Sequence, residues 1–153
     1  MKKIMICVLS ICLLACSLLT SCGEGEKEGM QDGYYTAELS EYHFGWKEFV
    51  TICVMENKIV SVEYNAKNPS GFIKSWDIAY MRNMNPVSGT YPNKYTRTYG
   101  AQLLEEQNAD HLDAVSGASS SGKNFNKLAA AVLEKAKKGD TSIAIVEVES
   151  EGE

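Results

Sequence analysis

The sequence predicts an α+β domain in which a mostly antiparallel sheet packs against two to three helices. Two observations lead to this class. Alternating, β-branched segments follow one another between residues 33 and 66, and one more lies near the C-terminus. Between them lie three segments whose apolar residues recur at helical spacing. The order β-β-β-α-α-α-β groups the strands instead of alternating them with helices, which is typical of α+β domains.

Three strands are expected to open the domain. The segment "DGYYTAELS" alternates apolar and polar residues, as a strand with one buried face does. The runs "WKEFVTICVM" and "KIVSVEYNA" are separated by Glu56 and Asn57, and Asn tolerates a left-handed conformation, so we expect an N-terminal β-hairpin. Cys53 lies in the first of these runs, and we interpret it as a buried, unreactive core residue. The segment "TSIAIVEVE" predicts a final C-terminal strand.

Three helices are expected between the hairpin and the final strand. "SWDIAYMRNM" would begin at Ser75, a good N-cap, and end before Pro86. "YPNKYTRTYGAQLLEEQ" has Pro92 near its start. One side of that helix would carry Tyr95, Tyr99, Gln102 and Leu103. "NFNKLAAAVLEKAKKGD" has apolar residues at helical spacing and lysines in its last turn, and Gly139 would end it.

The N-terminus has the pattern of an export signal. Lys2 and Lys3 precede an uncharged run, residues 4–19, and small residues follow it. The ending Leu-Thr-Ser-Cys at residues 19–22 resembles a bacterial lipobox, which implies that Cys22 accepts the lipid and becomes the new N-terminus. The charged, Gly-rich stretch "GEGEKEGMQD" that follows would be a flexible tether.

These features divide the chain into four parts. They are a lipoprotein signal peptide (1–21), a lipidated cysteine with its tether (22–32), one folded domain (33–149) and a tail (150–153). The formal net charge is −5, and it becomes more negative once the signal is removed. This charge argues against nucleic-acid binding and against electrostatic docking on anionic lipid, so the lipid anchor would hold the protein to the membrane.

The mature domain offers neither a disulfide framework nor a metal site. Of the five cysteines, three lie in the signal and Cys22 takes the lipid, which leaves only Cys53. The two histidines, His43 and His111, have no partners at metal-ligand spacing, so we read them as surface residues and assign no metal.

The stretch "SGASSSGKN" at residues 116–124 permits three interpretations. From Gly117 it resembles a P-loop, but that motif needs Ser or Thr where Asn124 stands, and it belongs on a parallel sheet. From Ser120 it reads S-x-x-K, with Lys123 as the base of a penicillin-binding enzyme, but the companion motifs S-x-N and K-T-G are absent from the sequence. We therefore set both aside.

The third interpretation includes the residues upstream. The run from Asp113 to Ser119, "DAVSGAS", resembles the flavinylation motif of the FMN-binding domain family, in which Asp, two variable residues, Ser or Thr, Gly, Ala and Thr or Ser follow one another. The resemblance extends from about Asp32 to Lys138 and makes residues 33–149 an FMN-binding domain. It implies that a flavin transferase esterifies the phosphate of FMN to the hydroxyl of Ser119.

The local chemistry of the loop also suits a phosphate. Small residues let a ligand approach the backbone, three serines offer hydroxyls, and the following helix presents its N-terminus. The predicted cofactor-binding residues are Asp113, Ser116, Gly117, Ala118, Ser119, Ser120 and Ser121. The flavin ring needs an aromatic or apolar pocket. Candidates for it are Trp46, Trp76, Tyr80, Met81 and Tyr95.

We therefore expect a membrane-anchored lipoprotein of the bacterial cell envelope. It would carry FMN, covalently bound at Ser119, and transfer electrons on the outer side of the cytoplasmic membrane. Its partners would be a flavin transferase and a membrane redox donor, and it would be a cofactor carrier, not a stand-alone catalyst. Two alternatives stay open. One is a non-redox binding module that holds flavin or another ligand reversibly, and the other is a structural surface lipoprotein.

Overall fold

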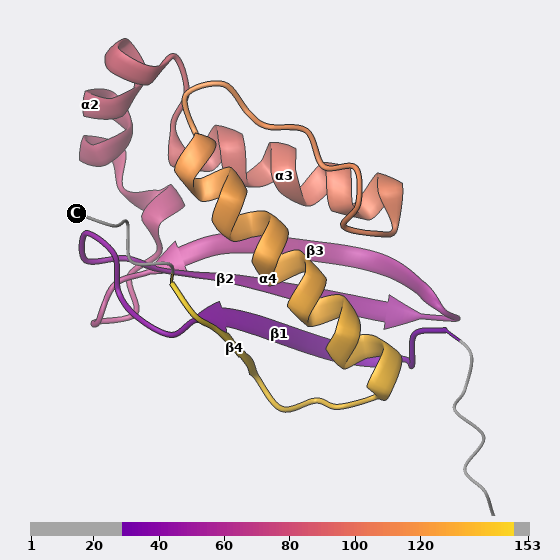
Figure 1. Cartoon of the computed structure of the whole chain (residues 1–153). Coiled ribbons are helices and arrows are strands. Elements are labelled where there is room, and N and C mark those ends of the chain that lie inside the picture. Colours follow the sequence, from indigo (N-terminus) through magenta and orange to yellow (C-terminus); the bar gives the residue numbers. More distant parts are fainter. Residues whose placement is uncertain (1–28, 149–153) are drawn as a thin grey trace, which may run out of the picture.

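The computed structural model describes residues 29–148 (Figure 1). The predicted signal peptide, the lipid-acceptor Cys22, most of the tether and the tail lie outside the described residues. The elements are β1 (Gly33–Leu39), β2 (Lys47–Met55), β3 (Lys58–Lys67), the 3-10 turn η2 (Lys74–Trp76), α2 (Ile78–Ser88), α3 (Pro92–Glu106), α4 (Ser119–Lys138) and β4 (Ala144–Val146). Within this part of the chain, no helix is long and apolar enough to cross a membrane.

The four strands form one mixed sheet in the order β3-β2-β1-β4. β1, β2 and β3 pair antiparallel, and β4 pairs parallel to β1. α3 and α4 cover one face of this sheet (Figure 1). The predicted α+β class, the largely antiparallel sheet and the final strand are therefore confirmed.

The hairpin turns at the predicted residues. Glu56 and Asn57 have φ values of 52° and 61°, so both occupy the left-handed region that tight hairpin turns require. Alternation along β2 directs Glu48, Val50, Ile52 and Val54 toward the helices. Cys53 has the opposite phase and is half-buried on the other face of the sheet, so its predicted place in the core is wrong.

The first helix differs from its predicted bounds. Ser75 does not cap it, because Ser75 lies in η2, three residues before the helix begins, and its hydroxyl accepts a hydrogen bond of 2.8 Å from the side chain of Asn65. The N-cap is Asp77, whose carboxylate accepts the N–H of Tyr80 at 2.9 Å. The helix also continues through Pro86. None of its described residues is buried, so water can reach the carbonyl that the proline leaves without its helical partner.

The other two helices follow the predicted periodicity. Tyr95, Tyr99 and Leu103 are buried on one side of α3. α4 buries its apolar stripe and ends at Gly139, which has a φ of 64°. It begins at Ser119, earlier than predicted, so three serines of the motif form its first turn. The core lies between this helix layer and the sheet, with Tyr35, Ile52, Leu103, Phe125 and Leu128 among its members.

Candidate functional site

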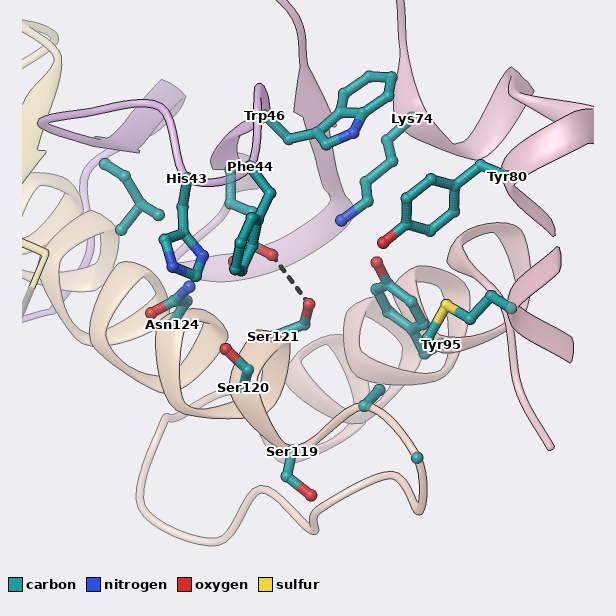
Figure 2. A pocket seen from close by; sticks show the side chains of 15 residues that line it. His43, Phe44, Trp46, Lys74, Tyr80, Tyr95, Ser119, Ser120, Ser121 and Asn124 are labelled. Carbon is teal, nitrogen blue, oxygen red and sulfur yellow. Dashed lines mark hydrogen bonds between the residues drawn. The ribbon is translucent and has the colours of Figure 1, made fainter. Parts of the chain in front are cut away.

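A pocket lies at the N-terminal end of α4, where three distant parts of the chain meet (Figure 2). The loop between β1 and β2 forms one wall, η2 and α2 form another, and the first turn of α4 forms the third. Its lining residues are Leu39, His43, Phe44, Trp46, Glu48, Lys74, Tyr80, Met84, Tyr95, Gly117, Ala118, Ser119, Ser120, Ser121 and Asn124. The cavity volume is about 200 Å³.

The loop before α4 depends on a glycine. Gly117 has a φ of 78°, which side chains rarely adopt. A Cβ at this position would overlap the carbonyl oxygen of Ser88 and would lie 3.1 Å from Cγ2 of Thr90. The glycine therefore lets the loop pack directly on the end of α2, and this contact positions the first turn of α4 relative to α2.

Tyr99 fixes the same loop from the core side. Its buried hydroxyl accepts the N–H of Val115 at 2.9 Å and donates to the carbonyl of Ala118 at 3.3 Å. Gly122, on α4, makes room for this hydroxyl, since a Cβ there would overlap it. Tyr99 thus ties the loop to α3 and α4 together.

The first turn of α4 is not capped by a side chain. The N-cap is Ala118, which has no oxygen to offer, so no side chain in the described part of the chain satisfies the first N–H groups of the helix. Free N–H groups and the positive end of a helix dipole favour an anion at such a turn. Ser119 is exposed at the rim, and its side chain points away from Ser121 (Figure 2).

A buried carboxylate lies inside the pocket. Glu48 has 8% of its surface exposed, and its Oε1 accepts the hydroxyl of Ser121 at 2.8 Å. Its Oε2 is buried and has no hydrogen-bond partner among residues 29–148. Burial raises the pKa of Tyr64 and of Tyr95, and the nearby charge of Glu48 raises both pKa values further.

Aromatic rings and one cation complete the walls. Trp46 and Tyr80 meet edge to face with ring centroids 6.3 Å apart. The Nζ of Lys74 lies 4.9 Å from the centroid of Tyr80 and 5.9 Å from that of Trp46. The lysine side chain reaches into the space between these rings (Figure 2). The pocket therefore combines an apolar slot with a positive charge.

The structure brings together most, but not all, of the predicted site. Gly117 to Ser121 line the pocket, and so do three of the ring candidates, Trp46, Tyr80 and Tyr95. Asp113 and Ser116 are exposed on the loop and do not line it. The backbone of Asp113 is held by Gln102, which accepts its N–H at 2.7 Å and donates to its carbonyl at 3.3 Å.

Two ring candidates lie elsewhere, and seven lining residues were not foreseen as site residues. Trp76 lines a separate groove beside α3, and Met81 does not line the pocket. The unforeseen residues are Leu39, His43, Phe44, Glu48, Lys74, Met84 and Asn124. The sequence carried only an ambiguous signal for Glu48, because it shares its strand phase with three aliphatic residues of β2 but the other phase is apolar as well.

Known proteins place this chain in a family. It matches no protein-family profile. It is 32% identical over 138 residues to the "15 kDa lipoprotein" of Treponema pallidum (strain Nichols), which covers 90% of this chain and 92% of the relative. Among solved structures, the crystal structure of the CPE2226 protein from Clostridium perfringens is 35% identical, covers 78% of this chain and 99% of its own, and superposes with a TM-score of 0.75.

A solution NMR structure of a protein from Clostridium thermocellum is 28% identical, covers 74% of this chain and 95% of its own, and has a TM-score of 0.48. The identity and coverage of the treponemal relative support the predicted class of small lipoprotein. The chain belongs to the family of the 15 kDa lipoprotein of Treponema pallidum.

Proposed function

We propose that this protein is a lipid-anchored carrier of FMN in the bacterial cell envelope, with the flavin esterified to Ser119. Flavin, when bound, supplies one-electron and two-electron redox chemistry, so the protein would transfer electrons between a membrane donor and an acceptor outside the cytoplasmic membrane. The observation that carries the proposal is the arrangement of the pocket. An uncapped helix N-terminus with three serines lies beside an aromatic slot.

The residues present fit the parts of a flavin nucleotide. The N–H groups of Ser119 to Ser121 would hold the phosphate, because they have no side-chain cap and the helix dipole favours an anion there. Trp46, Tyr80 and Tyr95 would hold the ring. A cavity of about 200 Å³ is smaller than the roughly 300–1,000 Å³ of pockets that enclose a whole ligand, so the ring would be inside and the phosphate at the rim.

The hydroxyls of the first turn are not equivalent. The proton of Ser121 is donated to Glu48, and its side chain points into the pocket. Ser119 is exposed at the rim, where a flavin transferase can reach it. In attachment, the Ser119 Oγ would lose its proton and attack the flavin-side phosphorus of a flavin dinucleotide; the new O–P bond would form as the phosphoanhydride bond breaks, and the nucleoside monophosphate would leave.

The position of the anchor favours an outward-facing pocket. The described chain starts at the hairpin end of the sheet, where the N–H of Met30 donates to Asn57 at 2.6 Å. Leu39, at the other end of β1, lines the pocket. A strand of seven residues spans about 20 Å, so a lipid on Cys22 would be tethered at the end of the domain away from the pocket.

The decisive test is the intact mass of the protein coexpressed with a flavin transferase. We expect the wild type and Ser119→Thr to gain the mass of FMN, and Ser119→Ala not to gain it. Ser120→Ala and Lys123→Ala are matched controls on the same turn, and both should keep the flavin, because a misplacement of about 1 Å can reduce a rate about 100-fold. Flavin retained by Ser119→Ala and lost by Ser120→Ala would show that the acceptor is misassigned.

Two further outcomes separate the alternatives. A wild type that binds FMN without gaining mass would support a reversible binding module. A wild type that binds no flavin in either way would leave a structural lipoprotein as the better interpretation. Anchoring is tested separately, since Cys22→Ala should leave the protein unprocessed or release it from the membrane, and normal lipid labelling of that variant would contradict the anchor.

A further inference from the structure

Glu48 occupies a buried position of β2 that an apolar side chain would normally fill. On β2 it has the same phase as Val50, Ile52 and Val54, all of which are buried against the helices. A buried carboxylate loses its hydration, and this loss must be offset by hydrogen bonds from donors. The question is therefore which donors Glu48 has.

The protein supplies a donor to only one of its two oxygens. Ser121 donates to Oε1 at 2.8 Å, whereas Oε2 has no partner within the described chain although it is buried. Tyr64 is close enough for Glu48 to raise its pKa, but its hydroxyl donates to the carbonyl of Ser121 at 2.9 Å, so its proton is not on Glu48. Since Glu48 lines the pocket, the missing donor can come from a bound molecule.

The same contacts define what that molecule must present. The proton of Ser121 is used on Glu48, so this end of the pocket offers Glu48 Oε2 as an acceptor. An anion would be repelled here, whereas an N–H or O–H group would be bound. The hydroxyl that would be esterified is separate from it, because the side chains of Ser119 and Ser121 are two residues apart and so point about 200° apart around a helix of 3.6 residues per turn.

We propose that Glu48 recognises the flavin through its ring, with Oε2 accepting a hydrogen bond from the ring imide N–H. This inference rests on the proposed function and assigns it a specificity-determining residue. The flavin carries two kinds of donor, the imide N–H of the ring and the hydroxyls of the ribityl chain. The ring is the favoured source because Glu48 lines the same pocket as the aromatic side chains Trp46, Tyr80 and Tyr95.

The test measures reversible binding to the full-length protein, purified in detergent from cells that have no flavin transferase. The ligands are FMN, lumiflavin, which has the ring without the ribityl chain, and 3-methyllumiflavin, whose imide nitrogen has no hydrogen. A hydrogen bond to a charged group corresponds to about 10- to 100-fold in affinity. We expect the wild type to prefer lumiflavin to 3-methyllumiflavin by that factor, and Glu48→Gln and Glu48→Leu to lose the preference.

A matched control and a second readout separate recognition from a structural role. Glu38→Gln alters a carboxylate on the opposite face of the sheet, where Lys67 and Lys47 pair with it at 2.8 and 3.7 Å, and it should leave the preference intact. The ligand-free Glu48→Leu variant should unfold at the same temperature as the wild type or higher, because it removes an incompletely paired buried charge. A structural Glu48 would instead lower that temperature.

Each remaining outcome is decisive. If lumiflavin and 3-methyllumiflavin bind the wild type equally while Glu48→Gln weakens FMN, the donor is a ribityl hydroxyl and the assignment to the ring is wrong. If Glu48→Leu keeps the wild-type preference, Glu48 is not the acceptor, and the proposed function stands without it. If the wild type binds none of the three flavins reversibly, this inference fails, whereas the proposed function still depends on the mass gained beside a flavin transferase.

Discussion

Gly117→Ala tests the packing that places the first turn of α4, and Gly89→Ala is its matched control. Both glycines have a positive φ, 78° and 67°, so an alanine at either position has the same backbone penalty of about 1–2 kcal/mol. They differ in the space around them. A Cβ at Gly89 would meet nothing within 4 Å, whereas a Cβ at Gly117 would overlap the carbonyl oxygen of Ser88 and lie 3.0 Å from its carbonyl carbon.

The difference between the two variants therefore isolates the clash. Overpacking of this kind costs about 1–3 kcal/mol, so we expect Gly117→Ala to lose about 2–5 kcal/mol of the free energy of unfolding and Gly89→Ala about 1–2 kcal/mol. Urea unfolding followed by tryptophan fluorescence measures both values. Equal losses in the two variants would refute the argument, because they would mean that the loop does not pack closely against the end of α2.

Three further predictions concern the core and the sheet. Tyr99→Phe removes the acceptor of the Val115 N–H and should lower the free energy of unfolding by about 1–3 kcal/mol. A loss below about 0.5 kcal/mol would show that this hydrogen bond does not hold the loop. Cys53 is half-buried on the outer face of the sheet, so a thiol reagent should label it in the folded protein, and labelling that requires denaturant would place it in the core after all. Burial raises the pKa of Tyr64 and of Tyr95 in the folded state, so the unfolded chain loses these phenol protons first. Their contribution to the free energy of unfolding is therefore complete below about pH 10 and is lost as the pH rises further. A melting temperature that stays constant to about pH 12 would contradict this prediction.

Local patterns predicted the strands and helices but not where tertiary contacts overrule them. Alternation located β1 to β3 and periodicity located α3 and α4, because each of these elements buries one face. The predicted N-cap at Ser75 was wrong because Ser75 lies in η2, before the helix, where its hydroxyl accepts a hydrogen bond from Asn65 of β3. The final strand is shorter than its alternation suggests, because its pairing partner β1 ends at Leu39, opposite Val146.

The site shows the same division between local and long-range information. The loop motif is contiguous, so its residues could be read from the sequence, including the glycine that packs on α2. β2 carries apolar side chains on both of its faces, so the sequence could not say whether Cys53 or its neighbours face the helices. The pocket walls come from three separate segments, and only the fold brings Lys74 beside Tyr80 and Trp46.

In the proposed flavin site, the contact between Glu48 and Ser121 would let one pocket hold both a hydrogen-bond donor and an anion. The two residues are 73 positions apart in the chain, and the fold places the carboxylate beside the first turn of α4. The positive end of that helix stabilises a buried negative charge next to it, which makes Glu48 tolerable at a core position. The same helix end has N–H groups for a phosphate near Ser119, on its other side. Under the proposed function, recognition of the flavin would therefore depend on the packing of β2 against α4 as well as on the loop motif.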